Sequence, residues 1–229
     1  MATRKSQRIG IAIILAVTII GTIGSFAVMI LGQQNQEQQA ALLKTQQADY
    51  QKLVDAYTVQ QKAQATDLSA SYYGTFSQYA SRVGTFDRDS VTALSTEDLA
   101  VGTGATIDGS TKFAAYYIGW MPDGKIFDQS IDGTSLKSPF SIDTGLDGAS
   151  VIDGWKEGIK GMKIGGVRLI TIPSDKAYKE KGTTDSSGKE VIPPNTSLKF
   201  VVMAIDAPAA ITYPQMPEAL LKAYYGGGN

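Results

Sequence analysis

The Asp123-Gly124 pair lies between two apolar stretches, one from Phe113 to Trp120 and one that begins at Ile126. Such a pair is typical of a tight hairpin, because the second turn position needs a positive φ angle that glycine adopts without strain. The sequence therefore predicts two antiparallel strands, and it places Phe127 and Asp128 at the start of the second one.

A short helix and two further strands are predicted after this hairpin. Trp155 and Ile159 are four residues apart, which places them on one side of a helical turn. The apolar run 167–172 predicts a strand, which Pro173 ends because proline cannot donate to a ladder, and a last strand is expected over 197–205. Antiparallel strands wrapped on one short helix define an α+β fold.

Six short motifs in this region resemble those of the FKBP-type peptidyl-prolyl cis-trans isomerases, in the family's order and nearly its spacing. They are Tyr117-Ile118-Gly119, Asp123-Gly124-Lys125 with Phe127-Asp128, Pro139-Phe140, Val151-Ile152 with Gly154-Trp155 and Gly158, Ala177-Tyr178, and Ile192-Pro193-Pro194 with Leu198 and Phe200. The resemblance covers residues 92–206, roughly half the chain, and implies an FKBP-like antiparallel sheet wrapped on one short helix.

The resemblance also implies a site for a prolyl ring, with Trp155 as its floor. The Ile152 backbone N–H and the Tyr178 hydroxyl would hydrogen-bond substrate carbonyls, and Asp128 would lie beside the carbonyl that twists. These four residues are the implied catalytic set. The implied substrate-binding walls are Tyr117, Phe127, Phe140, Val151, Ile192 and Phe200. Plain core packing is the alternative interpretation of these aromatic and branched residues.

The chain contains no histidine and no cysteine. This excludes the commonest general base, a thiolate nucleophile and Cys-ligated zinc. Isomerisation of an X-Pro bond needs none of them, because its barrier of ~18–20 kcal/mol falls where an apolar site favours the twisted amide. We expect no cofactor and no metal. The net charge of −1, with both signs interspersed, gives no basic footprint for nucleic acid.

Three departures from the family pattern bear on the site. The segment between Asp128 and Phe140 is longer than the family's short form, and Ser150 stands where Glu or Gln is frequent. The loop 179–190 is also longer and polar. We expect this loop to change substrate preference.

Residues 9–32 carry no charged side chain and are mostly apolar. A stretch of ~20 apolar residues suffices to cross a bilayer, so this segment predicts a transmembrane helix. Arg4, Lys5 and Arg8 precede it and no basic residue follows before Lys44, which predicts a cytoplasmic N-terminus and an extracytoplasmic isomerase domain. The predicted location is the cell membrane, as a single-pass protein.

A cleaved signal peptide is the alternative for this segment, with Ser25-Phe26-Ala27 as its small-x-small site. The apolar run continues beyond that site through residues 28–31 and is longer than a signal-peptide core, which favours the transmembrane helix.

The rest of the chain divides into a Gln-rich helical stalk at 33–67, an aromatic-rich connector at 68–91 and a C-terminal tail at 207–229, around the 92–206 domain and after the 1–32 segment. The stalk is either a solvated helix or a dimeric coiled coil. The heptad positions are Leu43, Gln46, Tyr50, Leu53, Tyr57 and Gln60. The connector's aromatic stripe is expected to pack on the neighbouring domain. A short helix is expected at 217–225, and the X-Pro bonds of the tail leave an autoinhibitory role open.

The sequence thus predicts a membrane-anchored peptidyl-prolyl cis-trans isomerase that acts on X-Pro bonds of exported or envelope proteins. The alternative is a catalytically weak FKBP-like binding or chaperone module tethered to the membrane. A third hypothesis makes the stalk and tail the working parts of a cell-surface oligomer. Two further partners stay open: an FK506-like macrolide in the site, and a second copy of the chain through the stalk.

Overall fold

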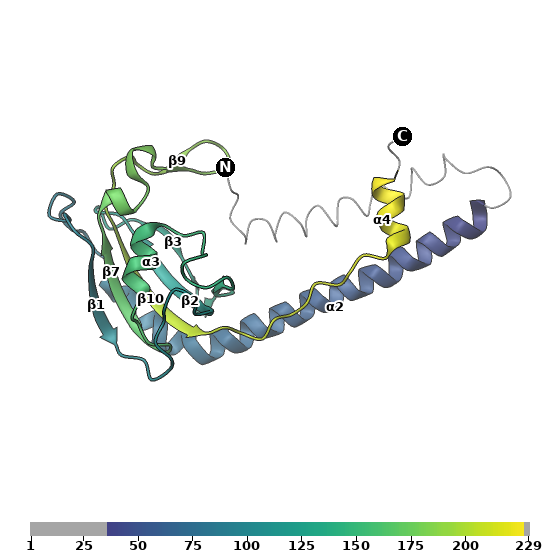
Figure 1. The fold of residues 1–229 in the computed structure, drawn as a ribbon, viewed down its shortest axis with the longest axis horizontal. Coiled ribbons are helices and arrows are strands. Elements are labelled where there is room, and N and C mark those ends of the chain that lie inside the picture. The colour runs from purple at the N-terminus through teal and green to yellow at the C-terminus, as the bar shows by residue number, and fades with distance from the viewer. Residues whose placement is uncertain (1–35, 227–229) are drawn as a thin grey trace. The chain divides into compact units, whose positions relative to one another are not determined.

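The computed structural model of the protein describes residues 36–226 (Figure 1). The predicted transmembrane segment at residues 9–32 lies outside this range. Within the range, no helix combines the length and the apolar character needed to cross a bilayer. The described residues form two compact units, one of residues 63–209 and one of residues 36–62 together with 210–226.

The unit of residues 63–209 is built on an antiparallel sheet with the strand order β1-β7-β10-β2-β3, and β6 also pairs with β2. The strands are β1 (Ser95–Ala100), β2 (Phe113–Trp120), β3 (Ile126–Gln129), β6 (Phe140–Ile142), β7 (Val167–Ile172) and β10 (Leu198–Asp206). The predicted strands and the hairpin at Asp123-Gly124 are confirmed, since Gly124 has a φ angle of +82° and β2 pairs with β3.

Two helices cover the two faces of this sheet. Alternate residues of β2 and β10, such as Phe113 and Phe200, pack in one cluster with α3 (Asp153–Ile159). The residues between them, such as Tyr116 and Val201, pack in a second cluster with the end of α2 (Gln36–Ser77). In Figure 1, α3 lies in front of the strands and the end of α2 passes behind them. Because β2 and β10 are buried on both faces, they read as nearly continuous apolar runs.

The aromatic stripe of residues 68–91 packs on the sheet, as expected. Phe76 is fully buried, and Tyr72 and Phe76 contact Tyr116 at ring-centroid distances of 6.0 and 6.1 Å. The helix continues through Gly74 to Ser77 and is followed by the 3-10 turn η2 (Gln78–Arg82). The sheet is therefore wrapped on α3 and backed by α2, a second layer that the predicted fold class did not contain.

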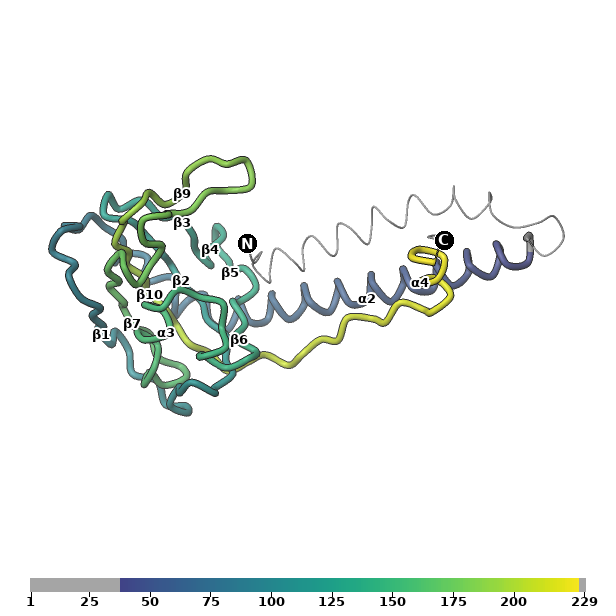
Figure 2. Tube along the Cα trace, turned by 45° about the horizontal axis from the view of Figure 1, so that its top comes forward, coloured from purple at the N-terminus to yellow at the C-terminus, as the bar shows by residue number. Residues whose placement is uncertain are grey.

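Two small hairpins account for the longer segments noted in the sequence (Figure 2). The segment between Asp128 and Phe140 forms β4 (Ile131–Asp132) and β5 (Ser135–Leu136). The segment after Tyr178 forms β8 (Thr183–Thr184) and β9 (Glu190–Ile192). The 3-10 turns η3 (Ser174–Lys176) and η4 (Lys179–Lys181) lie on either side of Tyr178.

The other unit is the first part of α2 with the C-terminal tail, which contains α4 (Glu218–Tyr225). Tyr50, Val54 and Leu220 are buried together, and Tyr57 meets Tyr213 edge-on with ring centroids 5.0 Å apart. Tyr50 and Tyr57, two of the predicted heptad residues, are therefore covered by the tail of the same chain, whereas Leu53 is 55% exposed.

Candidate active site

Five aromatic rings form a cluster between the sheet and α3. Trp155 on α3 is at its centre, with ring-centroid distances of 5.5 Å to Tyr117, 5.9 Å to Phe140 and 5.8 Å to Phe200, and all three contacts are close to perpendicular. Phe127 completes the cluster through Phe200 at 5.5 Å. Edge-to-face contacts of this kind are the favoured arrangement of aromatic side chains.

The structure brings the predicted site residues together. Trp155, Ile192 and Phe200 are 4%, 1% and 5% exposed and belong to the core cluster that includes α3. The other apolar and aromatic members of the predicted set are partly buried and pack against the same cluster: Tyr117, Phe127, Phe140, Val151, Ile152 and Tyr178. Partly exposed rings around a buried indole give this region an apolar surface that a ligand can reach.

Asp128 is attached to this cluster through Tyr117. The Tyr117 hydroxyl donates a hydrogen bond to Asp128 Oδ2 at 2.6 Å. Ser130, which is 4% exposed, binds the Tyr117 backbone: its Oγ accepts from the Tyr117 N–H at 2.9 Å, and its N–H donates to the Tyr117 carbonyl at 2.8 Å. The carboxylate thus has a fixed place at the edge of the aromatic cluster.

Ser130 is a residue that the sequence reasoning missed. Ser130 directly follows β3, two positions after Asp128. Strand alternation would place the two side chains on the same side, which is a weak signal by itself. Its double contact to Tyr117 depends on the register of β2 and β3, which pairs Ile118 with Gln129.

The indole N–H of Trp155 is buried and has no hydrogen-bond partner among the described residues. A buried Trp N–H usually has a partner, so this donor is unusual for a plain core residue. The other tryptophan differs, because Trp120 Nε1 donates to the Gly84 carbonyl at 3.0 Å on the opposite face of the sheet. The contrast favours a binding role for Trp155.

Close backbone approach fixes α3 against β7. A Cβ atom added to Gly158 would lie 2.5 Å from Cγ2 of Ile170, and one added to Gly154 would collide with Ile172. The two glycines are four residues apart, so both lie on the helix face that meets the strand. This close approach sets the depth of Trp155, which lies between them in the sequence.

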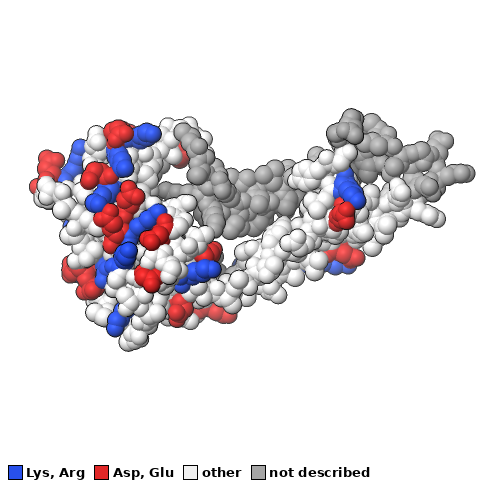
Figure 3. Space-filling model, viewed as in Figure 1, with Lys and Arg blue, Asp and Glu red and all other residues white. Residues whose placement is uncertain are grey.

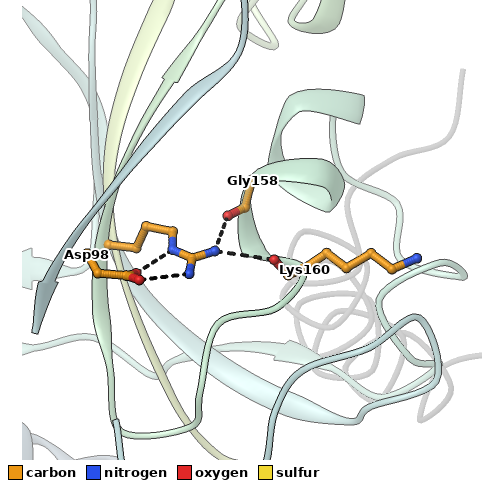
Figure 4. A network of polar contacts seen from close by, with 4 residues as sticks. Asp98, Gly158 and Lys160 are labelled. Carbon is orange, nitrogen blue, oxygen red and sulfur yellow. Dashed lines mark hydrogen bonds and ion pairs between the residues drawn. The ribbon is translucent and has the colours of Figure 1, made fainter. Parts of the chain in front are cut away.

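Arg168 fixes the end of α3 (Figure 4). Its side chain is largely buried, and its Nε and Nη2 donate to Asp98 on β1 at 2.6 and 3.2 Å. Its Nη1 donates to the carbonyl oxygens of Gly158 and Lys160 at 2.9 and 3.3 Å. Carbonyls at a helix C-terminus have no partner within the helix, so Arg168 satisfies two of them and ties α3 to two strands.

The turn before Tyr178 is held by an ion pair to the same helix. Lys176 Nζ on η3 donates to both carboxylate oxygens of Glu157 on α3, at 2.7 and 2.8 Å. The hydrogen bond to Glu157 raises the pKa of Lys176. Because this pair is partly exposed, it orients the turn rather than adding much stability.

A separate cavity of about 330 Å³ lies beside the site, between the β2–β3 turn and β9. Its apolar lining residues are Met121, Pro122, Val191 and Pro193, and its charged ones are Arg88, Asp123, Lys125 and Glu190. The predicted site residues do not line it. Met121 and Val191 also pack in or against the core cluster that includes α3, so the cavity borders this core.

Charged side chains of both signs are interspersed on the surface of residues 63–209 (Figure 3). On the face shown, Lys and Arg alternate with Asp and Glu and form no continuous basic stripe. The features that distinguish the site are therefore its cluster of aromatic rings and the Asp128 carboxylate, and not a patch of one charge.

The fold and the site together define an α+β domain that offers an apolar aromatic surface with the Asp128 carboxylate at its edge. A family model described as FKBP-type peptidyl-prolyl cis-trans isomerase matches residues 103–205. An FK506-binding protein of Neisseria meningitidis serogroup A is 38% identical over 110 residues, which cover 48% of this chain and 92% of that protein. The chain belongs to the FKBP-type peptidyl-prolyl cis-trans isomerase family.

Two further proteins are similar to this chain over the same region. FK506-binding protein 4 of Dictyostelium discoideum is 41% identical over 109 residues, which cover 48% of this chain and only 27% of that longer protein. A solved peptidyl-prolyl cis-trans isomerase from Pseudomonas syringae pv. tomato is 36% identical, with a TM-score of 0.40 and coverage of 49% of this chain and 73% of that one. The family model and the two FK506-binding proteins support peptidyl-prolyl cis-trans isomerase activity.

Proposed function

We propose that this protein is a membrane-tethered isomerase that accelerates cis-trans exchange of X-Pro bonds in exported or envelope proteins. The observation that carries the proposal is the arrangement of Trp155 and its neighbouring rings around the site, with the Asp128 carboxylate held by Tyr117.

Such a site needs no nucleophile and no metal; it only has to favour the twisted amide over the planar one. Exchange at an X-Pro bond is slow because the amide must lose its partial double bond as it twists. The prolyl ring would rest on Trp155, and Phe127 and Phe140 would flank it. The Ile152 N–H, at the N-cap of α3, and the Tyr178 hydroxyl would donate to substrate carbonyls. Asp128 would lie beside the twisting carbonyl. An apolar site disfavours the more polar planar amide relative to the twisted one, which lowers the barrier.

The proposed location rests on the sequence of residues 9–32 and the basic residues that precede it. A helix there would place the rest of the chain outside the cytoplasm. Substrates would then be proteins that fold after export. Separation of membranes followed by an alkaline wash tests the anchor: the protein stays in the pellet if the segment spans the bilayer, and appears in the wash if it does not.

The name of the Neisseria relative extends the proposal to one ligand. That protein is called an FK506-binding protein, and it shares residues across this domain. We therefore propose that FK506-like macrolides compete with substrate for the aromatic cluster. The β8–β9 hairpin follows Tyr178 after the turn η4 and would contact the part of a ligand that extends beyond the prolyl ring.

A protease-free assay with a fluorescent X-Pro peptide tests the enzymatic proposal on the full chain. Asp128→Ala and Tyr178→Phe are expected to lower kcat/KM by roughly tenfold or more while the protein stays folded. Asp89→Asn and Tyr225→Phe are the matched controls, since both residues are exposed. A folded wild-type protein that leaves the exchange at its uncatalysed rate contradicts the proposal and supports the binding-module alternative.

A further inference from the structure

The β4–β5 hairpin, which follows Asp128 in the chain, has a buried hydrogen bond to α2 besides a longer, exposed one from the Tyr73 hydroxyl to the Gly133 carbonyl at 3.4 Å. Ser69 on α2 is 7% exposed, and its Oγ accepts from the Leu136 N–H at 2.8 Å. Leu136 is 5% exposed and packs in the cluster of Phe76 and Tyr116. Each strand of this hairpin has only two residues, and hairpins this short are not stable by themselves. Its conformation therefore depends on the contact with α2.

The same hairpin is hydrogen-bonded to the candidate site. The Lys137 N–H donates to the Ser130 carbonyl at 2.8 Å, next to the residue that Ser69 binds. Ser130 in turn makes two hydrogen bonds to the Tyr117 backbone, and the Tyr117 hydroxyl donates to Asp128. A continuous series of bonds of 2.6 to 2.9 Å thus runs from Ser69 to the Asp128 carboxylate.

We infer that Ser69 is a positioning residue for the Tyr117–Asp128 pair, an inference that rests on the proposed isomerase function. Without its hydroxyl, the Leu136 N–H is left buried and unpaired, so the hairpin moves toward solvent to satisfy it. That movement displaces Ser130 and alters the orientation of Tyr117. Ser69 lies outside residues 103–205, so the end of α2 belongs to the catalytic unit in function as well as in packing.

The test compares Ser69→Ala with Ser71→Ala in the full chain. Ser71 is an exposed serine on the same helix, and its Oγ donates to the Asp67 carbonyl one turn earlier in α2. We expect Ser69→Ala to lower kcat/KM by roughly tenfold, because small displacements of a catalytic group are costly. Ser71→Ala is expected to match the wild type.

A double-mutant cycle separates positioning from a general loss of structure. If Ser69 acts through Asp128, Ser69→Ala has little further effect in an Asp128→Ala background. If the two losses in kcat/KM simply multiply, the positioning role is wrong.

Amide NMR signals provide a readout that does not need turnover. Ser69→Ala is expected to shift the signals of Leu136, Ser130 and Tyr117 and to leave Thr184 in the β8–β9 hairpin unchanged. An inactive wild-type protein overturns the proposed function, yet these signals still test the positioning. Unchanged Ser130 and Tyr117 signals overturn the inference even where the wild type is active.

Discussion

The Tyr117 hydroxyl donates a hydrogen bond to Asp128 across the β2–β3 pair, at 2.6 Å. The Tyr117 ring is at the same time perpendicular to Trp155, at a centroid distance of 5.5 Å. One side chain therefore joins the carboxylate to the aromatic cluster. A substitution at Tyr117 is therefore expected to affect both the Asp128 carboxylate and the packing around Trp155.

Removal of the hydroxyl alone tests this coupling. Tyr117→Phe keeps the ring in the cluster and removes its hydrogen bond to the Asp128 carboxylate. We expect kcat/KM to fall, and the free energy of unfolding to drop by up to ~1.5–3 kcal/mol, the contribution of a hydrogen bond to a charged group. A double-mutant cycle with Asp128→Asn measures the coupling. The kcat/KM of the double variant should be no lower than that of the less active single variant. Independent, additive losses in activity would contradict a shared role.

The sequence alone predicted the strands that carry the site. The Asp-Gly turn, the apolar runs and the stop at Pro173 are local signals, and the structure places β2, β7 and the β2–β3 hairpin where these signals indicate. The resemblance named Trp155, Phe200 and their neighbours, and these gather in one cluster. The strands and turns could be predicted at these positions because turn formation and strand alternation depend on residues close in the sequence.

The packing of the aromatic stripe on the sheet was expected, but the individual contacts of α2 could not be predicted in the same way. Ser69 and Leu136 are separated by 67 positions, and nothing in either neighbourhood indicates that they meet. Gly74 has a low local helix propensity, yet α2 continues through it because Phe76 packs on the sheet. Tertiary burial overrides local helix propensity in α2. Ser130 was missed because its partners depend on strand register, which is also a long-range property.

Fluorescence can report on the site because the protein has only two tryptophans. Trp120 is buried on the α2 face, whereas Trp155 is at the centre of the aromatic cluster. In a Trp120→Phe variant, FK506 is expected to change the emission of Trp155 in a saturable way. Phe140→Ala, which removes one neighbouring ring, should weaken the apparent affinity. A saturable signal that persists in a Trp155→Phe variant with Trp120 intact would place the binding elsewhere.

Gly158 on α3 and Gly74 on α2 should respond oppositely to alanine. At Gly158 the added methyl would press on Ile170, so α3 must shift, and overpacking of this kind costs ~1–3 kcal/mol. Isomerase activity should also fall, because a shift of α3 moves Trp155. At Gly74 nothing lies within 4 Å, so alanine should stabilise the helix by up to ~0.5–1 kcal/mol and leave activity unchanged. Urea unfolding with the isomerase assay checks both, and a neutral Gly158→Ala would refute the close-approach argument.

Two arginine ion pairs differ in burial and should differ in their contribution to stability. Arg168 has a side chain only 11% exposed and bonds to Asp98 and two carbonyls, whereas Arg82 and Glu97 form a pair with side chains 44% and 59% exposed. The Asp98 side chain is 44% exposed and stays solvated without its partner, so Arg168→Met is expected to destabilise through the two carbonyl oxygens that lose their donor, by ~1–3 kcal/mol. Arg82→Met should cost at most ~1 kcal/mol. Similar unfolding midpoints for the two variants would mean that the Arg168 network is not needed to hold α3.

Tyr116 makes stability sensitive to alkaline pH. Burial, with a smaller contribution from the neighbouring Tyr72, raises the pKa of Tyr116 to about 12, and its hydroxyl has no hydrogen-bond partner among the described residues. Between the ordinary tyrosine pKa of about 10 and this value, the unfolded chain loses the phenolic proton while the folded protein keeps it. Unfolding is therefore favoured as the pH rises through this window, and stability falls.

The comparison of wild type with Tyr116→Phe isolates this effect. At neutral pH the variant removes a buried unpaired hydroxyl, so its stability should equal or exceed that of the wild type by up to ~1 kcal/mol. Between pH 10 and 12 the variant should lose less stability than the wild type, and the difference in melting temperature should widen with pH. Tyr225→Phe, at a residue 74% exposed, should follow the wild type. Parallel stability curves for wild type and Tyr116→Phe would show that Tyr116 ionises equally readily in the folded and unfolded chains.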